Sequence, residues 1–247
     1  MSGHSKWHNI KNKKGKADAK RGKIFTKMAR KISVAVKEGG DDPDYNPALK
    51  AAIDSAKAEN MPNDNIERAI KKAAGGDDNA NYESVTYEGY GPSGVAVMVQ
   101  CLTDNRNRTA PDVRHAFDKH GGNLGTDGSV AFLFEKKGQL GIALDDSADP
   151  EAVEMDAIEA GAEDIRREDG GIEVLTEPDD YGAVRKALEE KGYDFVISEI
   201  TFIPQTTTVL DDFEDREKMR KLIDQLEEND DVQEVYHNWE NDDEDDE

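Results

Sequence analysis

The residues best suited to chemistry in this chain are cations gathered near its amino-terminal end. Residues 1–37 contain ten Lys and two Arg against a single acid, Asp18. The segment therefore carries a charge of +11, whereas the whole chain carries −23 and the remainder −34. Because Lys and Arg neutralise the phosphates of nucleic acids, this asymmetry favours a nucleic-acid-binding arm on an acidic body. The alternative is a solvated surface that only aids solubility.

Within this segment, the apolar positions between Lys23 and Lys37 follow a helical period, which Gly39 and Gly40 end. If the helix starts early enough, its lysines, spaced three or four apart, form a cationic stripe beside the apolar one. Trp7, His8 and Phe25 lie among the cations, and aromatic rings in such a setting stack on bases. The predicted nucleic-acid contacts in the segment are Lys6, Trp7, Lys11, Lys13, Lys14, Lys16, Lys20, Arg21, Lys23 and Lys27.

A second group of cations lies between a predicted strand and a predicted helix. Residues 103–109 (TDNRNRT) precede a helix expected at about 110–119, for which Thr109 is the expected cap. The arginines Arg106, Arg108 and Arg114 near a helix N-terminus suit a phosphate or a carboxylate-bearing partner. The alternative is a local network between these arginines and Asp104. The sequence leaves both open.

Other residue patterns do not support catalysis or metal binding. Cys101 lies in a predicted strand, which indicates a buried structural thiol. His4 and His8 have a spacing that suits a metal, but no further ligand completes a set. Residues 121–125 (GGNLG) lack the Lys-Ser/Thr of a phosphate-binding loop and follow a helix. We therefore predict a protein that is not an enzyme and that uses no cofactor and no metal.

The composition is typical of a soluble intracellular protein. At 247 residues, the chain is long enough for two or three domains. No apolar run approaches the roughly 18 residues needed to span a bilayer, and the first residues lack the apolar stretch of a signal peptide. A single cysteine forbids an internal disulfide and favours a reducing compartment. We expect a cytoplasmic protein without membrane contact, whose oligomeric state the sequence does not reveal.

Three helices are expected first, and the remaining chain alternates strands with helices. Helices at about 46–59 and 63–74 have helix-turn-helix proportions, which many inert bundles share. Residues 138–203 follow the order βαββαβ, as in a ferredoxin-like domain. When they are removed, the same order recurs in what is left, with strand 84–90 added at a sheet edge. Those remaining elements are strand 94–102, helix 110–119, strands 129–135 and 206–210, helix 212–228 and strand 232–237.

The predicted fold is therefore α+β: an N-terminal three-helix bundle followed by two ferredoxin-like α/β domains, one inserted in the other. The expected parts are a basic flexible arm (1–22), a helical domain with a helix-turn-helix-like pair (23–80), a ferredoxin-like domain (81–136 plus 205–239), an inserted ferredoxin-like domain (137–204) and an acidic tail (240–247).

Six sequence blocks, in order, carry a resemblance to one family. They are residues 3–10 (GHSKWHNI), 20–25 (KRGKIF), 60–62 (NMP), 87–92 (YEGYGP), 102–109 (LTDNRNRT) and 120–125 (HGGNLG). From residue 2 to about 238 the chain resembles the YebC/PmpR family, whose mitochondrial relatives activate translation of cytochrome oxidase. The resemblance implies a helical domain and two α/β domains in a cytoplasmic, cofactor-free chain. Some members are described as DNA-binding transcriptional regulators and others as translation factors acting on ribosomes, including stalled ones.

Two functions stay open on the sequence. A DNA-binding transcriptional regulator is favoured by the helix-turn-helix proportions and by the family description. Against it, the third helix offers only Arg68, Lys71 and Lys72 as cations, and no apolar dimer interface is visible. A ribosome- or RNA-binding translation activator that relieves stalled translation is favoured by aromatic residues among the lysines. An adaptor that binds only proteins through the acidic body, and an enzyme, fit the residues less well.

Overall fold

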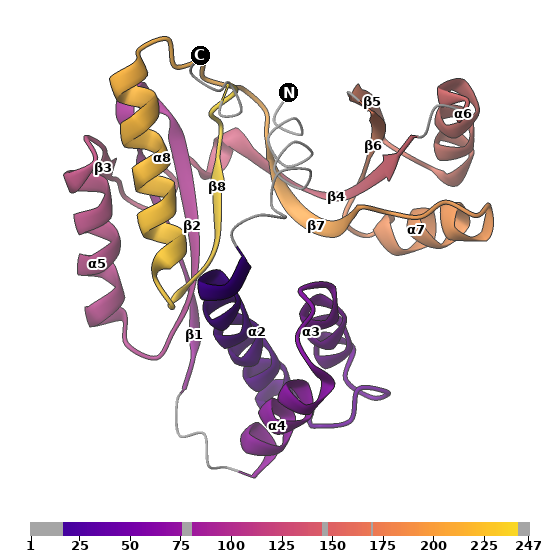
Figure 1. The fold of residues 1–247 in the computed structure, drawn as a ribbon, viewed down its shortest axis with the longest axis horizontal. Helices are drawn as coiled ribbons and strands as arrows, with labels where there is room; N and C mark the ends of the chain where they lie inside the picture. The colour runs from indigo at the N-terminus through magenta and orange to yellow at the C-terminus, as the bar shows by residue number, and fades with distance from the viewer. Residues whose placement is uncertain (1–16, 76–80, 145–147, 169, 242–247) are drawn as a thin grey trace. The chain divides into compact units, whose positions relative to one another are not determined.

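The computed structural model describes residues 17–75, 81–144, 148–168 and 170–241; side chains of residues 17–21 are not described. The described part opens with three helices and continues into two four-stranded antiparallel sheets with their helices (Figure 1). This confirms the predicted α+β fold class. The described residues divide into two units, one of residues 17–129 and 214–235, the other of residues 130–213 and 236–241.

The helical part consists of α2 (Ala17–Gly39), α3 (Pro47–Ala58) and α4 (Asn63–Ala74). The helix α2 begins six residues earlier than predicted, so that residues 17–22, expected in the arm, are helical. As predicted, the Asn46 side chain caps α3, accepting a hydrogen bond from the amide of Leu49 at 3.0 Å. The Asn46 side chain also donates to the carbonyl of Ala35 at 2.7 Å. One residue thus starts α3 and fixes it against α2.

The core of the three helices is apolar and closely packed. Ile32, Leu49 and Ala56 are fully buried, and Ile66 of α4 closes the same cluster. Phe25 packs against this cluster from α2 and is partly buried. The ring of Phe25 therefore belongs to the core, and its predicted place among base-stacking residues is not supported.

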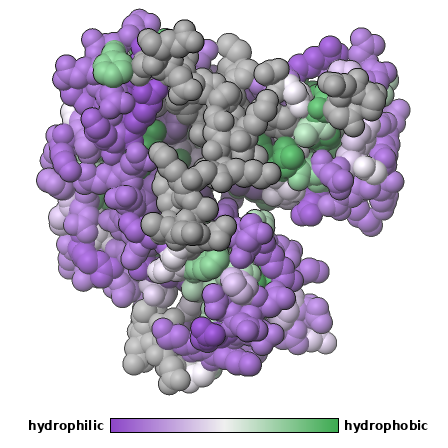
Figure 2. Space-filling model, in the orientation of Figure 1, coloured by the Kyte–Doolittle hydropathy of each residue, from purple (hydrophilic) through white to green (hydrophobic). Residues whose placement is uncertain are grey.

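The first sheet contains β1 (Glu83–Tyr90), β2 (Ala96–Thr103), β3 (Asn123–Leu124) and β8 (Val232–His237), in the order β3-β1-β2-β8. The helices of this sheet are α5 (Arg106–Lys119) and α8 (Phe213–Glu228). Their exposed surface is hydrophilic in Figure 2, whereas Met219, Leu222 and Leu226 of α8 are buried. The two helices touch at His120 Nε2 and Gln225 Oε1, which lie 2.9 Å apart.

Three details of this sheet differ from the sequence prediction. The strand β1 lies inside the sheet rather than at an edge, because it pairs with β2 along its whole length on one side and with β3 on the other. The predicted strand at 129–135 is instead a short 3₁₀ helix, Ala131–Leu133, followed by Phe134, where β4 begins. The predicted strand at 206–210 is reduced to one isolated bridge, between Thr208 and Trp239. In the predicted ferredoxin-like order, strand 206–210 would lie beside β2, and β1 occupies that place.

The second sheet contains β4 (Phe134–Ala143), β5 (Asp164–Glu168), β6 (Gly171–Thr176) and β7 (Ile197–Pro204), in the order β5-β6-β4-β7. Together with α6 (Pro150–Ala160) and α7 (Tyr181–Glu190), these strands follow the predicted βαββαβ order. The two helices cover one face of the sheet with a shared apolar cluster. That cluster consists of Leu140, Ile142, Val153, Ala157, Ile172, Val174, Val184 and Leu188.

The start of the predicted acidic tail is part of the folded chain. The carboxylate of Glu240 accepts a hydrogen bond from the hydroxyl of Thr207 at 2.6 Å. The Asn241 side chain accepts a hydrogen bond from the amide of Leu210 at 2.9 Å and donates one to the carbonyl of Leu210 at 3.0 Å. Within residues 17–75, 81–144, 148–168 and 170–241, no helix is long and apolar enough to cross a membrane.

Candidate nucleic-acid interface

The structure describes only part of the predicted interface. Of the predicted contacts, Lys6, Trp7, Lys11, Lys13, Lys14 and Lys16 lie outside the described residues, as do His4 and His8. Lys20 and Arg21 lie on the first turns of α2, where only the backbone is described. The helix α2 thus begins inside the basic run and carries the rest of it as a helix.

Further along α2, two predicted contacts bind the protein itself. The ammonium of Lys23 donates to the carbonyl of Glu228 at 3.0 Å, and that of Lys27 to the carbonyl of Glu227 at 2.9 Å. Both carbonyls lie in the last turn of α8, where backbone oxygens lack helical partners and the helix dipole favours cations. A nucleic acid that bound Lys23 and Lys27 would have to replace these carbonyls.

The side chain of Lys27 is partly buried. Desolvation by burial lowers the pKa of Lys27 below its usual value, against the opposing attraction of Glu227, Glu234 and Asp230. Its neighbour one turn on, Lys31, forms an ion pair with Glu234 at 3.1 Å. The middle of α2 is therefore held against the acidic segment that ends α8 and leads into β8.

A buried carboxylate completes this contact. Asp231 is 3% exposed, and Arg30 of α2 donates to its Oδ1 at 2.7 Å. From α5, Arg108 reaches Oδ2 at 2.7 Å, and the hydroxyl of Thr109 lies 2.7 Å from the same oxygen. Burial raises the pKa of Asp231, but hydrogen bonds from Arg108, Arg30 and Thr109 outweigh that effect and hold the pKa below its usual value. We call Arg30, Arg108, Thr109 and Asp231 the Asp231 cluster.

Arg30 has further partners around this cluster. Its guanidinium donates to the carbonyl of Asp230 at 2.8 Å and to that of Leu102 at 3.2 Å, and lies 5.4 Å from the centre of the Tyr82 ring. The sequence analysis assigned no role to Arg30 or Asp231. A weak signal for Arg30 was its place on the basic helix, but nothing near Asp231 indicated a partner 201 positions away.

The helix α5 begins at Arg106, four residues earlier than predicted. Its cap is Asn105, whose side chain accepts a hydrogen bond from the amide of Arg108 at 3.2 Å. Thr109, expected as the cap, lies inside the helix and is fully buried. Its hydroxyl donates a hydrogen bond to Asp231 instead, so the predicted role of Thr109 as the helix cap is wrong.

The three arginines of α5 have different surroundings. Arg108 binds Asp104 at 2.9 Å as well as Asp231, so the local network considered from the sequence exists at this residue. The hydrogen bonds with Asp231 and Asp104 raise the pKa of Arg108. The Arg106 side chain is 58% exposed and only 3.7 Å from the carboxylate of Glu83. Arg114 is exposed and makes no hydrogen bond or ion pair with the residues that the structure describes.

Exposed cations also lie on the outer surfaces of the helical part. Arg68, Lys71 and Lys72 of α4 are exposed, and Lys71 is 3.8 Å from Glu67. Lys50 and Lys57 of α3 are exposed as well. These side chains can contact phosphates, which position a protein on nucleic acid without reading sequence.

The sequence predicts a buried structural thiol at Cys101. Cys101 is 1% exposed, and burial, the largest effect, raises the pKa of its thiol to about 12. The predicted burial of this thiol is confirmed, and a thiol so far from ionisation is a poor nucleophile. Among the described residues, no three His, Cys, Asp or Glu side chains form a group suited to a metal ion.

Comparison with known proteins identifies the family. Residues 5–76 match the family model described as the TACO1/YebC protein N-terminal domain. Residues 82–239 match the one described as the TACO1/YebC second and third domain. The chain belongs to the TACO1/YebC family. The resemblance inferred from the six sequence blocks is thereby confirmed.

Individual relatives match over nearly the whole length. A protein of Finegoldia magna is 61% identical over 241 residues, covering 98% of this chain and all of that one. One from Thermoanaerobacter pseudethanolicus is 55% identical over 247 residues, covering both chains completely. Each is named a probable transcriptional regulatory protein. The crystal structure of a conserved hypothetical protein from Aquifex aeolicus matches with a TM-score of 0.79 at 47% identity, covering 92% of this chain and 93% of that one.

Proposed function

We propose that this TACO1/YebC-family protein is a non-enzymatic regulator of gene expression that binds nucleic acid. The affinity comes from the basic run of residues 6–21, since each cation that neutralises a phosphate releases a counterion. The names of the relatives, probable transcriptional regulatory proteins, support the regulatory role. The acidic remainder of the chain repels phosphate and limits binding to the basic surfaces.

The observation that carries this proposal is the position of Asp231 between two cationic groups. Asp231 binds Arg30 of α2 and Arg108 of α5 through the same carboxylate. The basic run that continues into α2 therefore starts from a point fixed relative to α5. Arg106 and Arg114, exposed on α5, form a second contact for the same ligand. Two contacts in fixed geometry bind a rigid or folded nucleic acid better than either does alone.

The first candidate ligand is DNA, with the protein as a transcriptional regulator. The names of the relatives favour it, as do the exposed cations of α3 and α4. The second candidate is folded RNA of the ribosome, with the protein as an activator that relieves stalled translation. The fixed spacing of the two cationic groups favours that second ligand, because folded RNA offers phosphates at defined positions in three dimensions.

The salt dependence of binding tests the role of the basic run. Replacing Lys11, Lys13 and Lys14 with Gln removes three phosphate contacts. The slope of log affinity against log salt concentration should then flatten by about two to three units. The matched control replaces Lys136, Lys186 and Lys221, exposed lysines elsewhere in the chain, with Gln. An unchanged slope in the first variant would move the binding site away from the basic run.

Sedimentation of the native protein from cell extract separates the two ligands. A ribosome-bound protein migrates with ribosomal particles in a sucrose gradient and moves to the top after ribonuclease treatment. A transcriptional regulator stays at the top in both gradients and is enriched on specific DNA segments after cross-linking. Migration with ribosomes that resists high salt would exclude weak charge attraction as the cause.

A further inference from the structure

The face of the second sheet opposite α6 and α7 combines charged and polar side chains with the apolar Leu175, Ile197 and Ile203. In β4, alternate residues point to opposite faces, so Glu135, Lys137 and Gln139 share the face that Leu140 and Ile142 do not. The strand register continues this face across the sheet. Gln139 pairs with Leu175, Gly141 with Glu173, Asp164 with Leu175 and Arg166 with Glu173. We call Glu135, Lys137, Gln139, Asp164, Arg166 and Glu173 the polar sheet face.

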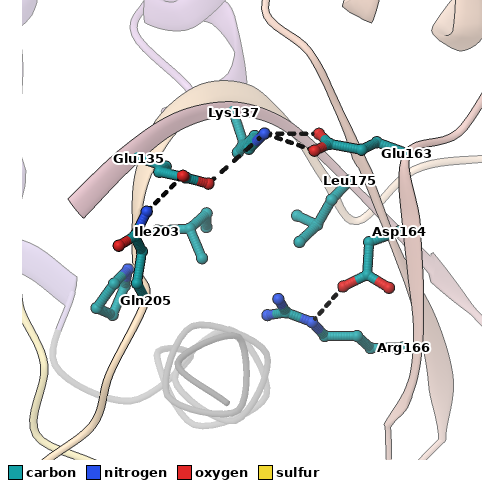
Figure 3. Close-up of a pocket in the computed structure, with 9 residues that line it drawn as sticks. Glu135, Lys137, Glu163, Asp164, Arg166, Leu175, Ile203 and Gln205 are labelled. Atoms are coloured by element: carbon teal, nitrogen blue, oxygen red, sulfur yellow. Dashed lines mark hydrogen bonds and ion pairs between the residues drawn. The ribbon is translucent and has the colours of Figure 1, made fainter. Parts of the chain in front are cut away.

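Acids outweigh bases on this face. The ammonium of Lys137 lies 2.7 Å from Glu163, 2.6 Å from Glu177 and 3.6 Å from Glu135, so that one cation serves three carboxylates. These hydrogen bonds, led by Glu163, raise the pKa of Lys137 above its usual value. Figure 3 shows Lys137 between Glu163 and Glu135 at the rim of a hollow. The hollow therefore has an excess of negative charge and suits cationic groups.

On the opposite side of this hollow, the single positive charge of Arg166 lies near two carboxylates, those of Asp164 and Glu173. Its Nε lies 3.1 Å from the carboxylate of Asp164, and its Nη1 lies 3.5 Å from that of Glu173. Figure 3 shows Arg166 and Asp164 together beside the hollow. The other oxygen of Glu173 accepts a hydrogen bond from the Gln139 amide.

A buried acceptor on the same face lacks a partner. Gln139 is 1% exposed and Glu173 is 2% exposed. The Gln139 amide donates to Glu173, while its carbonyl oxygen Oε1 has no hydrogen-bond partner. Such an acceptor can take a hydrogen bond from an N–H donor of a bound group. This observation is independent of the charge excess and is compatible with a ligand that carries N–H donors.

We propose that the polar sheet face binds the basic amino-terminal segment of the same chain, residues 1–16. This inference rests on the proposed function, because the bound segment is withheld from nucleic acid. The segment contains five lysines, Lys6, Lys11, Lys13, Lys14 and Lys16, and no acid. Sixteen residues span up to about 55 Å when extended, whereas a four-stranded sheet is only about 15 Å wide. The charges are complementary and the segment is long enough to cross the width of the sheet, so that the face acts as an internal competitor of nucleic acid.

Zero-length cross-linking of the full-length chain tests the contact directly. A carbodiimide joins a lysine to a carboxylate only where the two touch. We expect amide links from Lys11, Lys13 or Lys14 to Glu135, Glu163 or Asp164, identified by mass spectrometry at low salt and lost at high salt. A mixture of isotope-labelled and unlabelled protein distinguishes the sources. Links only between differently labelled chains, or links scattered equally over all acids, would overturn the proposal.

Neutralising the face tests the competition. The variant Glu135→Gln with Asp164→Asn should bind nucleic acid about three- to tenfold more tightly, since the internal competitor is weakened by up to two ion pairs. The control, Glu189→Gln with Glu190→Gln, removes the same charge from exposed positions on α7 and should leave affinity close to that of the parent. Equal tightening in both variants would mean a general charge effect and would contradict the competition.

The two proposals fail separately. If the chain binds no nucleic acid but the intramolecular cross-links form, the proposed function is wrong and the contact with the sheet face stands. If nucleic acid binds with the expected salt dependence but no cross-links form, the proposed function stands and the sheet-face inference falls. Thermal unfolding of each variant, compared with the parent, shows that the substituted chains are folded.

Discussion

Arg108 and Asp231, 123 positions apart in the sequence, form a two-pronged ion pair in which Nη2 lies 2.9 Å from Oδ1 and 2.7 Å from Oδ2. Arg30 binds the same carboxylate at Oδ1, 2.7 Å away. The Asp231 side chain is 4% exposed, against 15% for Arg30 and 47% for Arg108. A carboxylate buried to this degree is stable as an ion only with its partners in place. The cluster therefore joins α2 and α5 as one unit.

Replacing Asp231 with Asn should destabilise the protein strongly. The substitution leaves the guanidinium of Arg30 largely buried without its counter-charge, and breaking a buried pair in this way costs about 3 kcal/mol. Urea unfolding followed by circular dichroism measures the change. The control is Asp230→Asn, an exposed neighbour whose backbone carbonyl, not its side chain, contacts Arg30. That variant should change stability by less than about 0.5 kcal/mol. Similar losses in both variants would contradict the role of the cluster.

The same carboxylate makes stability depend on pH in the acid range. In the folded state, the hydrogen bonds to Arg108, Arg30 and Thr109 hold the pKa of Asp231 below that of the unfolded chain, which is about 4. Its contribution is therefore complete above that value and is lost as the pH falls through the lower, folded pKa. The difference in unfolding free energy between the parent and Asp231→Asn should shrink as the pH falls below about 4. A difference that stays constant down to pH 3 would disagree.

The elements that the sequence predicted well are those with local signals. The cap at Asn46 followed by Pro47 correctly started α3, and the helical period correctly located α2 and α4. The alternation of strands and helices between 138 and 203 gave the element order of the second sheet. Each of these signals lies within a few residues of the structure that it specifies, which is why it can be seen without knowledge of the fold.

The features that escaped prediction depend on distant partners. Asn105 and Thr109 are both residue types that cap helices well. Asp231 decides between them, because it accepts a hydrogen bond from the hydroxyl of Thr109. Lys27 has the spacing of a phosphate-binding lysine, yet its ammonium meets the C-terminal carbonyls of α8, 200 positions away. A one-dimensional pattern cannot distinguish a cation that faces solvent from one that caps a remote helix.

The nested arrangement of the two sheets stays a prediction that fragments can test. Phe134 at the start of β4 pairs directly with Pro204 at the end of β7, so the two ends of the segment lie side by side, about 5 Å apart. The apolar cluster under α6 and α7 lies wholly between these ends. Residues 134–204 expressed alone should therefore unfold cooperatively on heating, and a short Gly-Ser turn in their place should leave a folded remainder. The absence of a cooperative transition in both fragments would contradict the nesting.

The arginines of α5 should separate into one with a structural role and two that bind the ligand. Arg108→Ala removes a partner of buried Asp231 and should lower the melting temperature. The double variant Arg106→Ala with Arg114→Ala changes only exposed side chains and should leave that temperature unchanged. It should weaken nucleic-acid binding by about 1.5 kcal/mol for each lost charge-assisted contact. Thermal unfolding and fluorescence titration of the same preparations measure both properties.

Measuring the binding of several ligands shows whether Arg106 and Arg114 form a specific second contact or only add positive charge. Because α5 is held to α2 through Asp231, the two arginines add to the basic run only on a target that presents phosphates to both. Their loss should therefore weaken binding to ribosomes or folded RNA more than binding to a short DNA duplex. The control is Arg185→Ala with Lys186→Ala on α7, which removes two exposed cations far along the sequence from α5. Equal losses on every ligand would mean nonspecific charge, and a double variant that melts early but binds normally would make Arg106 and Arg114 structural as well.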